Sequence, residues 1–138
     1  MFLKHLKKMI FPLFPTSGDY QQAESIKKKI PWAYPWAPVG EGGKGLIGEL
    51  HREICEKHVL FEKKVIPIGH GIGNDDVLFK ILPDGYYAVV HLTWQGKENS
   101  PIWPCTVLFK DLDDWLKNGL TKDKKWHEKI RREVRKER

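Results

Sequence analysis

Several groups of residues in this chain have types and spacings that can do chemistry, and the first centres on a histidine in a predicted strand. His91 lies within the segment Tyr86–Trp94, and Asp75 and Asp76 come just before the preceding predicted strand. An imidazole titrates near neutral pH and suits general-base work, and a neighbouring carboxylate can orient its ring. This pattern permits a hydrolase or nuclease centred on His91. The alternative is a packed histidine beside an Asn-Asp-Asp turn signature.

A second group has the residue types of a zinc site. His51, Cys55 and His58 are separated by four and then three residues, which places them on one face of a predicted helix. Imidazole and thiolate ligands at that spacing can share a tetrahedral zinc ion. No fourth ligand is evident, and the same face borders the apolar residues of that helix. We therefore expect no metal and no other cofactor.

Aromatic residues gather in loop-like segments. The stretch Ile30–Gly45 contains three prolines and four glycines, which argue against a regular element. Aromatic rings in such a stretch either pack on their own domain or stay exposed until a partner binds them. Aromatic residues are favoured anchors of protein interfaces. The predicted partner contacts are Trp32, Tyr34 and Trp36, with Trp103 from a later loop.

The C-terminal segment is basic. Lys122–Arg138 holds nine lysines and arginines against four acidic residues, and its apolar positions Trp126, Ile130 and Val134 recur at helical spacing. A basic helix attracts polyanions, so nucleic acid is a second possible partner. The mixed acids favour instead a self-stabilised, solvated helix. The residues proposed for nucleic-acid contact are Lys124, Lys125, Arg131, Arg132 and Arg135.

These groups must be positioned by a small mixed domain. Helices are predicted over Tyr20–Lys29, with Ser17 or Asp19 as N-cap, and over Leu46–His58, with Ile47, Leu50 and Ile54 as the apolar face. A short helix after Asp111 is expected to stop at Gly119, and Thr121 to cap the basic helix. The strands are predicted to be Val59–Ile68, Val77–Leu82, Tyr86–Trp94 and Thr106–Lys110.

Short links between these strands predict an α+β fold. We expect an antiparallel meander of three to five strands, flanked by N- and C-terminal helices that lie on one face. The 138 residues fit one domain, in which residues 1–45 form an N-terminal part, 46–120 the core and 121–138 the basic helix. Residues 2–13 are predicted to form a short basic amphipathic helix.

Composition narrows the class of protein further. The net charge is +6, and most of the excess lies at the two ends of the chain. No run of apolar residues approaches the length of a membrane span. The two cysteines, Cys55 and Cys105, are isolated, as in a reduced cytoplasmic protein.

The central stretch carries a sequence pattern. It consists of Asp75–Phe79, then Tyr87–Trp94, then Trp103-Pro104, and finally Asp113–Trp115. In this pattern the chain resembles a family of small uncharacterised bacterial α+β proteins. The resemblance covers roughly Leu46–Leu116, and it implies a coherent bacterial domain without implying an activity.

Taken together, these observations favour a non-catalytic binding or regulatory module that recognises a protein partner, in the manner of an immunity- or antitoxin-type protein. The alternatives are a nucleic-acid-binding protein that uses the basic C-terminal helix and a hydrolase or nuclease centred on His91. The oligomeric state is left open.

Overall fold

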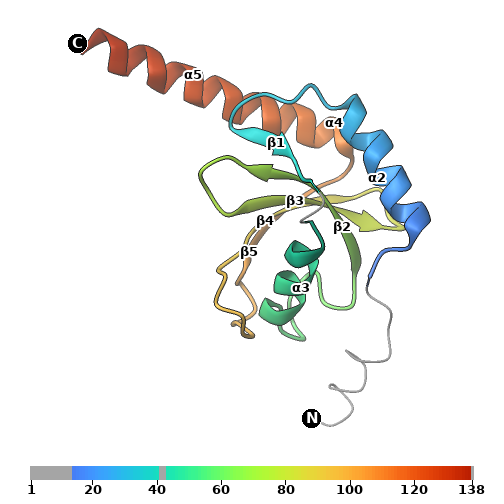
Figure 1. The fold of residues 1–138 in the computed structure, drawn as a ribbon. Helices are drawn as coiled ribbons and strands as arrows, with labels where there is room; N and C mark the ends of the chain where they lie inside the picture. Colours follow the sequence, from blue (N-terminus) through green and yellow to red (C-terminus); the bar gives the residue numbers. More distant parts are fainter. Residues whose placement is uncertain (1–13, 41–42, 138) are drawn as a thin grey trace.

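A five-stranded sheet forms the centre of the computed structural model, which describes residues 14–40 and 43–137. The strands follow one another in the order β1-β2-β3-β4-β5, and every neighbouring pair is antiparallel. This arrangement confirms the predicted α+β meander (Figure 1). The strands are β1 (Trp36–Pro38), β2 (Lys64–Gly71), β3 (Asp76–Leu82), β4 (Tyr87–His91) and β5 (Cys105–Phe109).

One face of the sheet is covered by α3 (Gly43–Glu53). The apolar side chains of Ile47, Leu50 and Ile54 are buried there, as their spacing predicted. They pack against the strand residues that point to this face, among them Phe79 and Val90. Burying this row removes most of its apolar surface from water, which is what holds α3 to the sheet.

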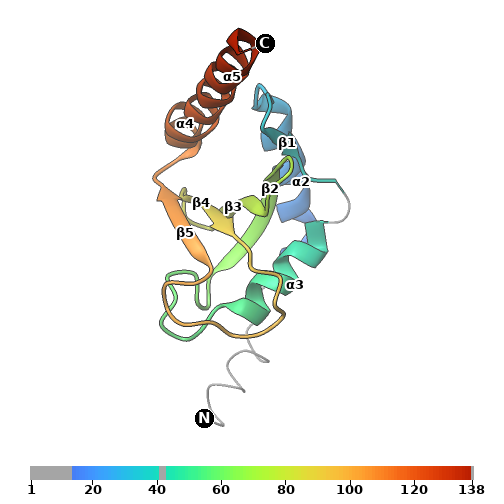
Figure 2. The same ribbon diagram turned by 90° about the vertical axis from the view of Figure 1, so that its left-hand side faces the viewer.

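The opposite face is covered by α2 and α4, so the expectation of helices on one face alone is wrong (Figures 1 and 2). α2 (Ser17–Lys29) buries Ala23 and Ile26 against β2, and α4 (Leu112–Trp115) buries Trp115 completely. Both faces are covered because strands β2 and β3 carry apolar residues at nearly every position.

Helix boundaries differ from the prediction at several places, among them α3, which was predicted over Leu46–His58 and spans Gly43–Glu53. Thr16, not Ser17 or Asp19, is the N-cap of α2, and Asp19 completes a capping box from the N3 position. Gly119 does not stop a helix, because α4 continues through a π-helical turn, η1 (Leu116–Leu120), directly into α5 (Thr121–Lys136). Thr121 accordingly gives no side-chain cap, and its hydroxyl donates to the Leu116 carbonyl at 2.7 Å.

Strand boundaries also differ. The segment expected to be irregular contains β1, whose three residues pair with Gly69–Gly71 of β2 at the edge of the sheet. Pro38 is tolerated there because an edge strand needs no donor on its outer side. The predicted strand Val59–Ile68 begins only at Lys64, since Cys55–Lys63 forms a series of turns.

α5 leaves the sheet and extends away from the rest of the structure (Figures 1 and 2). None of its residues is buried. Its first turn is attached to β1, because the indole N–H of Trp36 donates to Asp123 at 2.9 Å. The Trp36 ring in turn packs edge-on against Trp115, with 5.4 Å between the ring centroids.

Two remaining predictions concern the ends of the chain and the membrane. The N-terminal amphipathic helix expected over residues 2–13 lies outside the described residues. Within residues 14–40 and 43–137, no helix is both long and apolar enough to cross a membrane.

The contact between Gly119 and Trp115 yields a test of the packing in η1. A methyl group on residue 119 would lie 2.5 Å from Cδ1 and 2.6 Å from Nε1 of the buried Trp115 ring. We expect Gly119→Ala to lower the free energy of unfolding by about 1–3 kcal/mol, the usual cost of overpacking. Urea unfolding of the purified protein measures this loss.

The matched control is Gly45→Ala in α3, where the added methyl group meets nothing within 4 Å. This variant should gain up to about 1 kcal/mol from the better helix propensity of alanine. Equal stability of the two variants would contradict the packing account of Gly119.

Candidate functional site

Two buried glutamates stand at the C-terminal end of α3. Glu49 and Glu53 are one helical turn apart, and their exposed fractions are only 3% and 0%. Charged side chains are almost never buried so fully without partners. Their partners are therefore the first indication of what this end of the helix does.

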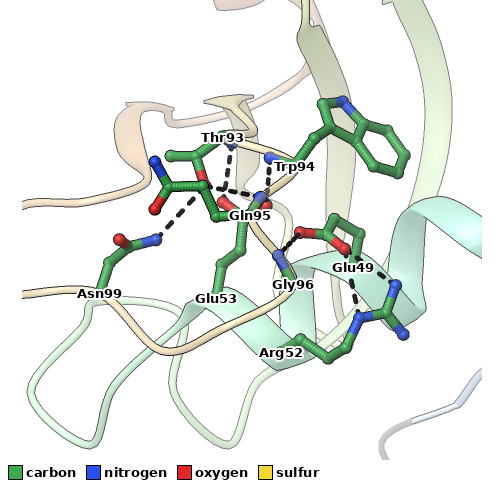
Figure 3. Close-up of polar contacts among 8 residues, drawn as sticks. All are labelled: Glu49, Arg52, Glu53, Thr93, Trp94, Gln95, Gly96 and Asn99. Atoms are coloured by element: carbon green, nitrogen blue, oxygen red, sulfur yellow. Dashed lines mark hydrogen bonds and ion pairs between the residues drawn. The ribbon is translucent and has the colours of Figure 1, made fainter.

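Both carboxylate oxygens of Glu53 accept hydrogen bonds from the loop that follows β4. The backbone N–H groups of Thr93 and Trp94 each donate to one oxygen at 2.8 Å (Figure 3). The backbone N–H of Asn99 donates to the Glu53 carbonyl at 2.9 Å. Glu53 thus binds both ends of the segment 93–99 through side chain and main chain.

Glu49 binds the middle of the same segment. One carboxylate oxygen accepts from the Gly96 backbone N–H at 3.0 Å, and the other accepts from Arg52 Nε and Nη2 at 3.2 and 2.9 Å (Figure 3). Arg52 itself is mostly exposed. The buried end of this ion pair is therefore the carboxylate, and the guanidinium closes the site toward solvent.

The two carboxyl groups influence each other. Burial raises the pKa of Glu53, and the hydrogen bond to Glu49 raises this pKa further. The same hydrogen bond is the main reason why the pKa of Glu49 is lowered, with Arg52 and the Gly96 N–H acting in the same direction. The pair therefore favours one shared proton, which avoids two buried negative charges side by side.

The loop held in this way has an unusual backbone. Trp94 has a φ of 59°, a left-handed conformation that costs a bulky residue about 1–2 kcal/mol. Its ring is nevertheless half exposed, at 50%. The carboxylates stabilise a backbone that presents an aromatic side chain to solvent. Because their oxygens are occupied by donors of the chain itself, the pair suits positioning rather than acid-base catalysis.

The predicted zinc ligands are not brought together. α3 ends at Glu53, so Cys55 and His58 do not share a helical face with His51. His58 is buried, and its Nδ1 accepts from the Leu60 N–H at 3.0 Å while its Nε2 lies 3.0 Å from the Pro104 carbonyl. Across the described ranges, no three His, Cys, Asp or Glu side chains are placed to hold a metal ion.

His91 and Asp76 do come together. They are cross-strand partners on β4 and β3, and Nδ1 of His91 lies 2.9 Å from Oδ1 of Asp76. Asp75 takes no part in this contact, and its carbonyl accepts from the Leu92 N–H instead. Half of the His91 side chain is exposed on the sheet surface. The hydrolase or nuclease hypothesis gains an oriented imidazole and stays a hypothesis.

The predicted aromatic contacts divide into two groups. Trp36 is buried, with 3% of its surface exposed, and Trp32 is half-buried, with its indole N–H donating to the Lys27 carbonyl at 2.9 Å. Both rings pack against Trp115. Tyr34 and Trp103 are exposed. A partner contact therefore stays a prediction for these two residues, while Trp32 and Trp36 serve the core.

Sequence reasoning missed the glutamate pair. A signal was present, because Glu53 directly precedes Ile54 and follows Leu50 by three residues, on the core-facing side of the helix. A carboxylate at such a position needs buried donors. Nothing in the sequence indicates that these donors come from residues 93–96, because the loop has no fixed geometry until the sheet forms.

Comparison with protein-family models, with curated proteins and with solved structures finds no match for this chain. The family resemblance of the central stretch therefore stays a prediction.

Removing one carboxylate oxygen tests the hold on the loop. Glu53→Gln keeps the shape of the side chain but turns one acceptor into a donor, so one of the two backbone N–H groups loses its partner. We expect the free energy of unfolding to fall by about 1–3 kcal/mol, the cost of a buried unpaired donor. Urea unfolding near neutral pH measures the change.

The exposed Glu62 provides the control for this substitution. Glu62→Gln should change the stability by no more than about 0.5 kcal/mol. If Glu53→Gln changes the free energy of unfolding as little as Glu62→Gln does, the carboxylate does not hold the loop.

The opposite pKa shifts of the pair predict a pH optimum. The pKa of Glu53 is raised, so its contribution to stability is lost as the pH rises through that raised value. The pKa of Glu49 is lowered, so its contribution is lost as the pH falls through that lowered value. Relative to a Glu49→Gln, Glu53→Gln double variant, the wild-type protein should be most stable between the two values.

Urea unfolding of both proteins from about pH 3 to about pH 8 measures this difference in stability. A maximum within the range is the expected result. A difference that changes in one direction only would mean that the two carboxyl groups do not share a proton.

Proposed function

We propose that this chain is a binding module that recognises a protein partner, and that the partner contacts strand β5 and the loop before it. The main support comes from β5, an edge strand to which no strand of the described chain pairs on the outer side. Its five residues include no charged side chain and no proline. Val107 and Leu108 are both exposed, on opposite faces of the strand.

Edge strands of this kind are templates for another chain. Soluble proteins usually protect an edge by a very short strand, a proline or a charge. The other edge of this sheet is protected in two of these ways, because β1 has three residues and ends in Pro38. The difference between the two edges favours β5 as the place where an extended segment of a partner adds to the sheet.

The loop before β5 adds apolar anchors to this edge. Ile102 is the most exposed of the large apolar side chains in the described chain, and Trp103 and Trp94 are exposed as well. Aromatic side chains are enriched among the residues that dominate binding energy. The Glu49–Glu53 pair holds the segment that begins with Trp94, so this part of the surface is ordered before a partner arrives.

An immunity- or antitoxin-type protein, which acts by covering another protein, is one form of such a module. Pre-ordering supports this kind of role, since a rigid surface spends less free energy on ordering when it binds. The same surface also explains why Trp103, among the aromatic residues predicted from the sequence, is the one we retain as an anchor.

The test is affinity capture from the native cell, with the full chain as bait and proteins quantified by mass spectrometry. Val107→Lys places a charge on the edge strand, and Trp103→Ala removes an anchor. We expect the captured amount of a specific partner to fall by about tenfold or more with either variant, in line with the cost of removing an interface anchor.

The control is Ile72→Lys, which places the same charge at an exposed apolar residue in the β2–β3 turn. A partner retained by this variant and lost by the other two supports the proposal. Capture that is unchanged by Val107→Lys and Trp103→Ala overturns it. Self-association that is removed by Val107→Lys, measured by sedimentation, would make a second copy the partner.

A further inference from the structure

The sides of α5 differ in what they contact. Asp123, His127 and Arg131 form the side that faces the rest of the protein. Asp123 accepts from Trp36, and the Tyr34 ring lies 5.1 Å from His127 and 5.8 Å from the Arg131 guanidinium, measured to the ring centroid. These residues are spaced by four, which is one row along a helix. This row fixes which way the helix is turned.

The side opposite this row is purely basic. Its residues are separated by three, four, three and four positions, which places them in a second row, about half a turn from the first at 3.6 residues per turn. All of them are exposed, and within residues 14–40 and 43–137 none forms an ion pair. The row consists of Lys122, Lys125, Lys129, Arg132 and Lys136.

The acidic residues of α5 lie outside this row. Asp123 is on the opposite side, where it binds Trp36, and Glu128 and Glu133 fall to either side of the row. Five cations without an interposed acid therefore extend over about 21 Å, at a rise of 1.5 Å per residue. Such a row repels a second copy of itself, so a polyanion is the fitting partner.

We propose that this basic row of α5 binds the phosphate backbone of a nucleic-acid duplex. A duplex carries one negative charge per about 1.7 Å of its axis, so a stretch of duplex as long as the row carries roughly a dozen phosphates, some of which face the row. Because the row points away from the rest of the protein, a rod-shaped ligand can lie along it without meeting the sheet or α2. The surface is separate from β5, so this inference does not depend on the proposed partner there.

The position of the apolar residues of α5 favours nucleic acid over a lipid bilayer. Trp126, Ile130 and Val134 form a third row, only about 60° from the row that faces the protein. Ile130 lines a shallow groove with Tyr34, His127 and Arg131. A bilayer that buried this apolar row would meet the Tyr34 segment, whereas a duplex on the basic row would not.

The structure also changes which residues carry this contact. Lys125 and Arg132, predicted from the sequence, belong to the basic row. Lys124 and Arg135 lie between this row and the row that faces the protein, and Arg131 is turned toward Tyr34. Lys122, Lys129 and Lys136 belong to the basic row in place of these three residues, because the attachment of α5 at Asp123 decides which side of the helix faces outward.

The experiment is a fluorescence-anisotropy titration of the full chain with a labelled duplex of about 20 base pairs, repeated at several salt concentrations. Five phosphate contacts predict a slope of about −4.5 in a plot of log affinity against log salt concentration. Lys122→Gln, Lys125→Gln and Lys129→Gln in one chain should reduce the slope to about −1.8. Glutamine preserves helix propensity, and circular dichroism checks that the helix remains.

The matched control removes the same charge elsewhere. Lys57→Gln, Lys63→Gln and Lys97→Gln replace three exposed lysines outside α5, and they should leave the slope near that of the wild-type chain. Equal losses in the two triple variants would show a response to net charge alone and would overturn the proposal. Absence of salt-sensitive binding at low salt would also overturn it.

Vesicles of phosphatidylglycerol test the lipid alternative directly. The proposal expects that Ile130→Ser together with Val134→Ser leaves duplex binding within about twofold, since neither residue lies in the basic row. Tight vesicle binding that this double variant abolishes, combined with weak duplex binding, would assign α5 to a membrane surface instead.

Discussion

The buried carboxylates of Glu49 and Glu53 are the constraint on which the exposed end of the sheet depends. Three backbone N–H groups of the loop after β4 donate to these oxygens, and the loop leads directly into β5. Without these acceptors the donors would lose their partners, and the left-handed backbone at Trp94 would have no compensation. The pair thus couples the end of α3 to the position of the edge strand.

A second constraint attaches α5 to the sheet. Trp36 and Trp115 pack edge-on in the core, and the Trp36 indole binds Asp123 at the start of α5. α4, η1 and α5 form one continuous helix. The buried position of Trp115 in α4 therefore also fixes where the first turn of α5 lies. The basic row faces outward because these contacts fix the rotation of α5. The two proposed surfaces therefore rest on different parts of the core.

The α+β meander and the apolar face of α3 were predictable, because they follow from periodicity and short links between strands. β1 was not, since Pro35 and Pro38 argue against a strand and its pairing with β2 joins residues that are far apart in the sequence. Glycine is typical of the residue at which a helix ends, so Gly119 was predicted to end one. In the structure its lack of a side chain leaves room for the Trp115 ring instead. The partners of Glu53 lie 40 and 41 positions away, beyond what local spacing can indicate.

The most direct test of this account is amide hydrogen exchange, measured by nuclear magnetic resonance on the wild-type protein and on Glu53→Gln. Thr93 and Trp94 lie outside β4, so only the Glu53 carboxylate protects their N–H groups. We predict slow exchange at both residues in the wild-type protein and exchange at least about tenfold faster at one of the two in the variant, with β4 unchanged. Equal exchange rates at Thr93 and Trp94 in the two proteins would contradict the claim that the buried pair holds the loop.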